Sequence, residues 1–327
     1  MAFLRGILIV ISVIGLLIAG LVFAFADMDI PADTLVQKYG QPPSQFVDLP
    51  SGAHVHYRDQ GLRTGQALLL LHGSNASLHT WEPWVKQLGD EFRIITVDLP
   101  AHGLTGQVPG DDYSQEGMAK FVDEFMRTIK VDRFAIGGNA MGGTVAVRYT
   151  LMHPEHVTHL MIIGTAGLPM KSPLDEGLGL KLARIPVVQN VLLFVTPRRL
   201  FEDGLKKATV DHSLVTPEMI DRYWELSRRE GSRMALIKRY QAPTDDYIEK
   251  NVEKLNTPTL MMWGDADLLV PRDMGDAYNA IVKGSTLVVY KNIGHMPMEE
   301  IPEQSARAVR RFLEPPPAAP VTPPPAP

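Results

Sequence analysis

The residues with the clearest chemical potential form a glycine-rich turn that has an alanine at its centre. Residues 137–143 read GGNAMGG and lie between a predicted strand and a predicted helix over 144–153. In a sharp strand-to-helix turn, flanking glycines permit a strained backbone and a close approach of strand and helix, so the central side chain projects beyond the carboxyl end of the sheet. A serine at the centre would be a nucleophile. This chain has Ala140 there, and alanine has no oxygen that could attack a carbonyl.

An acid and a base follow in the order that such a nucleophile requires. Residues 263–271 read WGDADLLVP at the end of one predicted strand, and residues 294–296 read GHM after the next. The order nucleophile, acid, histidine is typical of a nucleophile on a strand–turn–helix unit. We predict that Asp267 orients the ring of His295 and stabilises its charged form. Asp265 is the competing acid, which we expect to face solvent or to cap the turn.

A third candidate loop follows an earlier apolar run. Residues 72–75 read HGSN and come directly after the leucines at 68–71. An oxyanion loop would lie here, because the backbone N–H groups of Ser74 and Met141 could then converge on one carbonyl oxygen. Taken alone, a His-Gly pair after a strand indicates only a tight turn. Its place beside the other two motifs favours the oxyanion interpretation.

These motifs need a sheet that brings their loops to one edge. Short alternating runs predict a hairpin at 46–58, and helix-like segments separate the later apolar runs. Those runs lie at 67–71, 92–97, 134–136, 160–163, 259–263 and 286–290. Continuous apolar strands suit a sheet that is covered on both faces. We therefore predict the α/β class, with a mostly parallel sheet flanked by helices.

The pattern also predicts how the chain is divided. No strand pattern appears from about 168 to 243, a stretch rich in helix formers, which favours a helical cap over one end of the sheet. The predicted segments are an N-terminal apolar segment at 1–26, a linker at 27–45, a core at 46–167 and 244–313, a cap at 168–243, and a proline-rich disordered tail at 314–327.

The apolar N-terminal segment predicts a membrane anchor. Residues 6–26 are uncharged, Arg5 precedes them, and the stretch is about as long as the roughly 20 residues that a spanning helix needs. The preceding positive charge places the N-terminus in the cytoplasm and the catalytic domain on the periplasmic or extracellular side. A secreted protein with a cleaved signal peptide is the alternative, because AFA at 24–26 fits a cleavage site.

Composition excludes several classes of function. The chain has no cysteine, so thiol catalysis and zinc–thiolate sites are excluded. Its formal charge of -5 and its lack of a long basic run argue against a nucleic-acid partner. Seven further histidines show no recognisable metal-ligand spacing with carboxylates, which favours surface or core roles. They are His54, His56, His79, His153, His156, His159 and His212. We predict no metal and no organic cofactor.

With four motifs in this order, residues from about 46 to 313 resemble the α/β-hydrolase family, in particular its esterase-like and carbon–carbon-bond hydrolase branches with a helical cap. The fourth motif is DLPAHG at 98–103, where the family usually has glycine in place of Ala101. The resemblance implies that Asn75, Asn139 and Met296, which flank the reacting groups, contact substrate. It also implies a small-molecule substrate.

In the family's mechanism, a serine at position 140 would attack a carbonyl with His295 as base and then as acid. Removing such a serine costs on the order of a million-fold in turnover, while binding can survive. The chain should then bind a small, largely apolar carboxylic ester without hydrolysing it. Ala140 is either an engineered change in an active hydrolase, which the intact Asp267, His295 and oxyanion loop favour, or natural.

Three other functions stay open. One is cleavage of a carbon–carbon bond in a vinylogous diketone, or of a lactone. Another is a non-catalytic ligand receptor on a hydrolase fold. The third is proton abstraction by His295 with Asp267, as in the few cofactor-free oxygenases and lyases built on this fold. The sequence predicts neither the natural substrate nor the oligomeric state.

Overall fold

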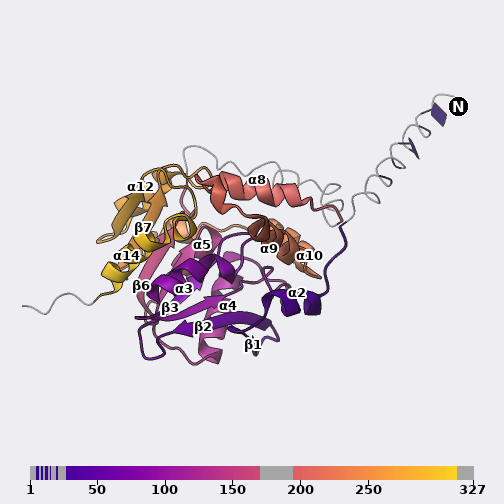
Figure 1. Cartoon of the computed structure of the whole chain (residues 1–327). Coiled ribbons are helices and arrows are strands. Elements are labelled where there is room, and N and C mark those ends of the chain that lie inside the picture. The colour runs from indigo at the N-terminus through magenta and orange to yellow at the C-terminus, as the bar shows by residue number, and fades with distance from the viewer. Residues whose placement is uncertain are drawn as a thin grey trace, which may run out of the picture.

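The computed structural model describes residues 27–169 and 194–314, together with a few single residues between 5 and 20. Within these residues eight strands form one sheet in the order β1-β2-β4-β3-β5-β6-β7-β8 (Figure 1). The strands are β1 (Ser44–Asp48), β2 (His54–Gly61), β3 (Ala67–Leu71), β4 (Arg93–Val97), β5 (Phe134–Asn139), β6 (Val157–Ile163), β7 (Thr259–Gly264) and β8 (Thr286–Tyr290). β2 pairs antiparallel with β1 and β4, and the other neighbours are parallel. The predicted α/β class with a mostly parallel sheet is confirmed.

Helices cover both faces of the sheet. One apolar cluster includes side chains from α4 (Gln115–Thr128), α5 (Met141–Met152) and α12 (Arg272–Ile281). The other includes side chains from α3 (Glu82–Leu88) and α14 (Pro302–Leu313). Shorter elements connect them: η1 (Leu78–Trp81), α11 (Tyr247–Asn251), η3 (Val252–Lys254) and α13 (Pro297–Glu300).

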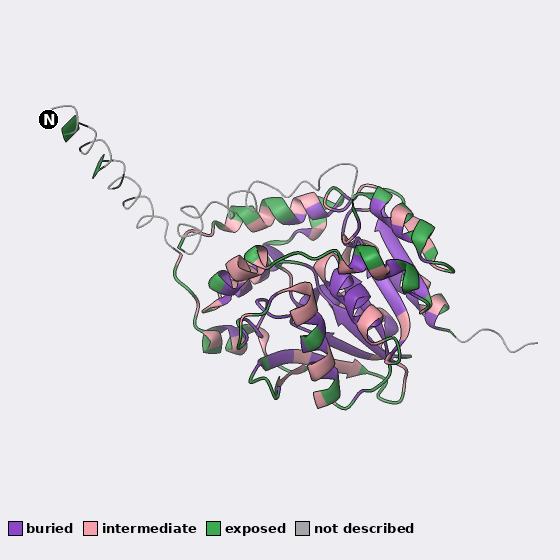
Figure 2. Cartoon of the chain, turned by 180° about the vertical axis from the view of Figure 1, so that it is seen from behind, coloured by how far each residue is buried: buried purple, intermediate pink, exposed green. Residues whose placement is uncertain are grey.

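The apolar sequence of β3 follows from this double cover. Leu69 and Leu71 pack in the first cluster, and Leu68 and Leu70 pack in the second. Successive side chains of a strand point to opposite faces, so a strand covered on both sides needs apolar residues at every position. Figure 2 shows these central strands as buried. Each buried leucine contributes roughly 1.5–3 kcal/mol.

The parallel register aligns the strand ends that matter for chemistry. Leu71 at the end of β3 pairs with Gly138, and Asn139 at the end of β5 pairs with Ile163. Gly264 at the end of β7 pairs with Tyr290. The loops that follow these strands therefore leave the sheet at the same edge.

Three helices fill the described part of the segment predicted as a cap. They are α8 (Arg198–Ala208), α9 (Pro217–Ser227) and α10 (Ser232–Gln241), with a short η2 (His212–Leu214) between the first two. α9 begins at a proline, and the Thr216 hydroxyl accepts the Met219 N–H as its N-cap. Ile220 and Tyr223 of α9 belong to the same apolar cluster as Trp81, so the cap packs directly on the core. Residues 170–193 lie outside the described residues.

The segment predicted as a linker has its own structure. It contains helix α2 (Ala32–Tyr39), whose Leu35 is buried. Lys38 of this helix pairs with Glu225 of α9 at 2.7 Å, and Asp29 pairs with Arg233 of α10 at 2.6 Å. Residues 27–39 thus pack against the cap.

The two predicted terminal segments fall mostly outside the described residues. This holds for the apolar stretch at 6–26 and for the proline-rich tail beyond residue 314. Among the described residues, no helix has both the length and the apolar character needed to cross a membrane.

Candidate active site

Ala140 occupies a strained turn between β5 and α5. Its backbone angles are φ 49° and ψ −114°, a region that costs an L-residue on the order of 1–3 kcal/mol. The strand and helix approach so closely that a Cβ atom on Gly138 would lie 2.2 Å from the carbonyl carbon of Gly142. On the other side of Ala140, a Cβ atom on Gly142 would lie 2.2 Å from the carbonyl oxygen of Leu71, so backbone contact requires both glycines.

His295 and Asp267 form a buried pair. Nδ1 of His295 lies 2.7 Å from Oδ2 of Asp267, and each residue is 6% exposed. The other carboxylate oxygen, Oδ1, accepts the backbone N–H groups of Leu269 and Val270 at 2.8 and 2.9 Å. A buried carboxylate needs such partners. Since the His295 Nδ1–H donates to Asp267, the neutral ring presents an unprotonated Nε2.

Asp265 has a different role. Its Oδ1 accepts the backbone N–H of Asn292 at 2.7 Å. This bond ties the turn after β7 to the loop after β8. The structure thus pairs His295 with Asp267 and uses Asp265 in the turn.

Asn139 joins the Ala140 turn to the histidine loop. Its side-chain Nδ2 donates to the carbonyl oxygen of His295 at 3.0 Å and to that of Ile163 at 3.2 Å. The backbone N–H of Ala140 also donates to Ile163, at 2.9 Å. Asn139, predicted as a substrate contact, is 4% exposed and has its amide nitrogen committed to the backbone. These bonds give it a positioning role.

Gly164 lies where the paired acid and base come together. A Cβ atom built on this glycine would lie 2.8 Å from His295 Nδ1 and 3.0 Å from Asp267 Oδ2. Its φ is +51°, a conformation that glycine adopts without steric cost. The loop after β6 thus packs directly against the His295–Asp267 pair.

The predicted oxyanion loop lies beside Ala140. A Cβ atom on Gly73 would be 3.4 Å from the Cβ of Ala140. His72 is buried: its Nε2 accepts the Leu99 N–H at 3.0 Å and its Nδ1 donates to the Gly73 carbonyl at 2.8 Å. Burial lowers the pKa of His72, so the ring stays neutral and fixes the loop. Met141 is the first residue of α5, where backbone N–H groups lack helical partners.

The remaining predicted contacts differ in their surroundings. Ser74 and Asn75 are exposed on the loop. Met296 is 5% exposed and packs in the apolar cluster that also contains Trp81. Ser74 and Asn75 are therefore reached by solvent, whereas Met296 is the N-cap residue at which α13 begins.

Comparison with known proteins identifies the fold family. The family model described as alpha/beta hydrolase fold matches residues 66–302. This chain belongs to the α/β-hydrolase family. It is 26% identical over 272 residues to the uncharacterized hydrolase YugF of Bacillus subtilis, which covers 82% of this chain and 96% of that protein.

Other family members span lipases and carbon–carbon-bond hydrolases. Monoacylglycerol lipase abhd6-A of Xenopus laevis is 26% identical and covers 76% of this chain and 75% of its own length. A 2-hydroxy-6-oxononadienedioate/2-hydroxy-6-oxononatrienedioate hydrolase of Klebsiella pneumoniae is 25% identical, with coverages of 83% and 95%.

Two solved structures share the fold. A bacterial membrane phospholipase A superposes with a TM-score of 0.72 at 24% identity, covering 95% of this chain and 97% of the other. A meta-cleavage product hydrolase from Pseudomonas fluorescens, crystallised as a serine-to-alanine mutant with acetates, gives a TM-score of 0.71 at 23% identity, with coverages of 82% and 96%.

In this α/β hydrolase, a cap helix reaches the predicted oxyanion loop. The guanidinium of Arg239, on α10, donates to the Ser74 hydroxyl. The next residue, Tyr240, accepts a bond of 3.4 Å from the Asn75 amide. Sequence reasoning missed both cap residues, because nothing in their spacing places α10 over residues 72–75.

A half-buried acid also escaped prediction. Glu299 on α13 accepts a hydrogen bond from the Thr80 hydroxyl of η1. Burial raises the pKa of Glu299 to about 7, although Thr80 and Arg222 of the cap oppose the rise. A carboxyl group four residues after His295 therefore changes charge near neutral pH.

Two of the seven histidines lie close in space to the same carboxylate. Asp123, His153 and His156 offer ligand atoms that all lie within 4.8 Å of one another. The sequence showed no ligand spacing here, because Asp123 lies on α4, about thirty residues before the histidines.

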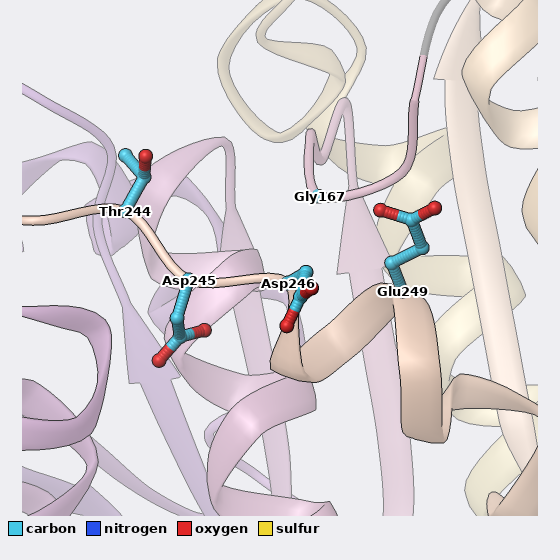
Figure 3. A pocket seen from close by; sticks show the side chains of 5 residues that line it. All are labelled: Gly167, Thr244, Asp245, Asp246 and Glu249. Carbon is cyan, nitrogen blue, oxygen red and sulfur yellow. The ribbon is translucent and has the colours of Figure 1, made fainter.

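A separate cavity of about 440 Å³ opens on the surface beside α11 (Figure 3). It is lined by Gly167, Thr244, Asp245, Asp246 and Glu249. Asp245 pairs with Arg148 at 2.9 Å and Asp246 pairs with Lys250 at 2.6 Å. Two of its three carboxylates are thus already neutralised by side chains of the protein.

Proposed function

We propose that this protein is a serine-hydrolase-type member of its family in which Ala140 stands at the position of the nucleophile. Its ligand is a small, largely apolar carboxylic ester, which the chain binds without turning it over. The observation that carries the proposal is the buried His295–Asp267 pair, joined through Asn139 to the strained turn at Ala140. Nothing in the proposed reaction requires a metal or an organic cofactor.

A serine at position 140 would complete a familiar reaction. Its hydroxyl oxygen would attack the ester carbonyl while Nε2 of His295 takes the proton. The backbone N–H groups of Ser74 and Met141 would stabilise the oxyanion. His295 would then protonate the leaving alkoxide. In the second half of the reaction, His295 would take a proton from water, which would attack the acylated residue 140. The serine oxygen would leave with the proton from His295, and the acid would be released.

Kinetics of the Ala140→Ser variant test this proposal. We expect it to hydrolyse p-nitrophenyl butyrate and the unchanged chain to be inactive. Adding His295→Ala should abolish the restored activity. Retained activity in the double variant would refute the assignment of the base. Silence of both the unchanged chain and Ala140→Ser on a broad ester panel would favour the receptor function, and activity of the alanine form alone would favour proton abstraction.

A carbon–carbon-bond hydrolase is the second candidate, and Arg239 favours it. Its guanidinium lies on the Ser74 hydroxyl, so a cation stands next to the predicted oxyanion loop. A ligand with a carboxylate could bind there by charge-assisted hydrogen bonds. The Klebsiella relative is named for such a dicarboxylate substrate.

Substrate charge separates the two candidates. In the Ala140→Ser background, we expect Arg239→Met to leave the KM of a neutral ester unchanged if the substrate is an apolar ester. For a vinylogous diketone carboxylate, the same change should raise KM at least about tenfold if Arg239 binds the acid group. Lactones, assayed with the same variants, test the lactonase alternative.

We also propose that the domain is exported and membrane-anchored. The support is the uncharged stretch at 6–26 with Arg5 before it. A fusion of residues 1–45 to alkaline phosphatase should be active, and alkaline carbonate should leave the full chain in the membrane pellet. Release of a shortened chain into the soluble fraction would instead favour a cleaved signal peptide.

A further inference from the structure

Three side chains with metal-binding chemistry meet at the far end of α5 from Ala140. Asp123 comes from α4, His153 directly follows α5, and His156 directly precedes β6. Their ligand atoms all lie within 4.8 Å of one another. The packing of α4 against α5 brings the carboxylate to the two imidazoles.

The orientation of His156 leaves one ring nitrogen available. Its Nδ1 donates to the backbone carbonyl of Asp132 at 2.7 Å. The neutral ring then has its lone pair on Nε2, which is the nitrogen left free to bind a metal ion. A backbone carbonyl that fixes the tautomer of a ligating histidine is the usual second partner in metal sites.

A candidate fourth ligand, a carboxylate oxygen of Glu155, lies next to both imidazoles. Glu155 Oε1 lies 3.4 Å from His156 Nε2 and 3.6 Å from His153 Nδ1. The side chain of Glu155 is 63% exposed, while the two histidine side chains are 27% and 30% exposed. An ion can therefore reach the imidazoles from solvent, and Glu155 has room to move toward it.

We propose that Asp123, His153 and His156 bind a late first-row divalent metal ion such as Zn²⁺, with Glu155 or water completing the coordination. Two imidazoles and a carboxylate suit zinc, cobalt, nickel and copper, whereas calcium and magnesium prefer oxygen ligands alone. In a tetrahedral zinc site with bonds of about 2.1 Å, the ligand atoms lie about 3.4 Å from one another. From the observed spacing of at most 4.8 Å, a pair of ligand atoms must close by up to about 1.4 Å.

The position of the metal makes its role structural. Residues of α5 separate Ala140 at one end of the helix from His153 at the other. The ion would join α4 to the loop between α5 and β6, at the opposite end of the helix from the reacting groups. It would stabilise the folded chain by an amount that grows with the logarithm of its concentration over its Kd, and it would take no part in ester chemistry.

Zinc titration of the full chain tests the proposal. The protein, without a polyhistidine tag, is treated with EDTA, desalted and titrated with Zn²⁺ by calorimetry. We expect one saturable site and a rise in Tm with added Zn²⁺. Asp123→Asn and His156→Gln should each weaken binding at least about tenfold and remove the rise in Tm.

Two controls keep the result interpretable. His54→Gln removes an exposed histidine that pairs with a single carboxylate, Asp48, at 2.6 Å, and should bind Zn²⁺ as the unchanged chain does. Equal Tm values in EDTA would show that the variants fold. Unsaturable binding by the unchanged chain, or equal affinity in Asp123→Asn and the unchanged chain, would overturn the site. Neither result depends on esterase activity, so the proposed function is tested separately.

Discussion

Nδ1 of His295 lies 2.7 Å from Oδ2 of Asp267, and the two residues are almost completely buried. The neighbouring backbone N–H groups fix the other carboxylate oxygen, so Asp267 cannot turn away. In the Ala140→Ser background we predict that Asp267→Asn lowers kcat on the order of ten-thousand-fold, because an amide favours the wrong histidine tautomer. KM should change little, since the binding groups stay in place. Steady-state kinetics with an aryl ester measure both values.

The adjacent acid provides the control for this change. Asp265 accepts a backbone N–H from Asn292, and an asparagine oxygen can accept the same bond. Asp265→Asn should therefore leave kcat within about threefold of the parent. A larger loss for Asp265→Asn than for Asp267→Asn would reverse our assignment of the acid.

Gly164 predicts a second way to disrupt the pair. A methyl group at this position would lie 2.8 Å from His295 Nδ1, on a backbone with φ +51°. We expect Gly164→Ala, in the Ala140→Ser background, to abolish most of the activity by displacing the imidazole and to destabilise the fold by about 1–3 kcal/mol. Ester kinetics and urea unfolding measure the two effects.

A glycine in open space isolates the backbone part of that effect. Gly284 has φ +73°, and a Cβ atom there would meet nothing within 4 Å. Gly284→Ala should lose about 1 kcal/mol of stability from strain and keep full activity. Equal activities for Gly164→Ala and Gly284→Ala would show that the His295–Asp267 pair does not need a residue without a side chain at position 164.

The sequence identified the parts of the site that depend on local geometry. The turn at Ala140 needs glycines because strand and helix touch there, and this need is visible in the residue order. β3 was predicted within its observed bounds, because a strand covered on both faces must be continuously apolar. Motifs at the ends of strands could therefore be predicted from a single sequence.

Features that depend on side-chain direction could not be predicted. Asn139 flanks Ala140 in sequence, yet its amide bonds the backbone of the histidine loop. Arg239 reaches Ser74 only because the cap folds over the loop, a contact that joins residues 165 positions apart. Helix α2 was missed because its few apolar side chains, such as Leu35, find their partners at Leu104 and Leu226, which are distant in the sequence.

Arg148 joins α5 to the segment before α11, and its contacts predict a contribution to the free energy of unfolding. It is 3% exposed, its Nη1 donates to both carboxylate oxygens of Asp245 at 3.0 and 2.9 Å, and its Nη2 donates to Glu116 at 3.1 Å. The guanidinium also lies 3.6 Å from the ring centre of Tyr247. We predict that Arg148→Met destabilises the fold by about 1–3 kcal/mol, less than for a fully buried pair because both acids are half exposed.

The free energies of unfolding of Arg148→Met and of a control variant, Arg127→Met, are compared by urea unfolding. Arg127 is 75% exposed on its side chain and lies 3.7 Å from Asp123. Arg127→Met should change the free energy of unfolding by less than about 0.5 kcal/mol. If Arg148→Met changed it equally little, the buried cluster would contribute nothing to stability.

Glu299 predicts a pH dependence of stability near neutrality. Its carboxyl group accepts a hydrogen bond from Thr80, and burial raises its pKa from 4.5 to about 7. Between these two values the folded chain holds a proton that the unfolded chain has lost. The contribution of Glu299 is therefore fully present below about pH 4.5 and is lost as the pH rises through about 7.

Glu299→Gln should remove this dependence. Glutamine keeps an oxygen that can accept the Thr80 bond, but it does not ionise. At pH 8 we expect the variant to be more stable than the unchanged chain by up to about 3 kcal/mol, since each pKa unit corresponds to about 1.4 kcal/mol. At pH 4.5 the two should be nearly equal. Urea unfolding at both pH values gives the difference, with Glu303→Gln, an exposed acid on α14, as the control. Parallel stability curves for the unchanged chain and Glu299→Gln would show that this carboxyl group ionises as readily in the folded protein as in the unfolded chain.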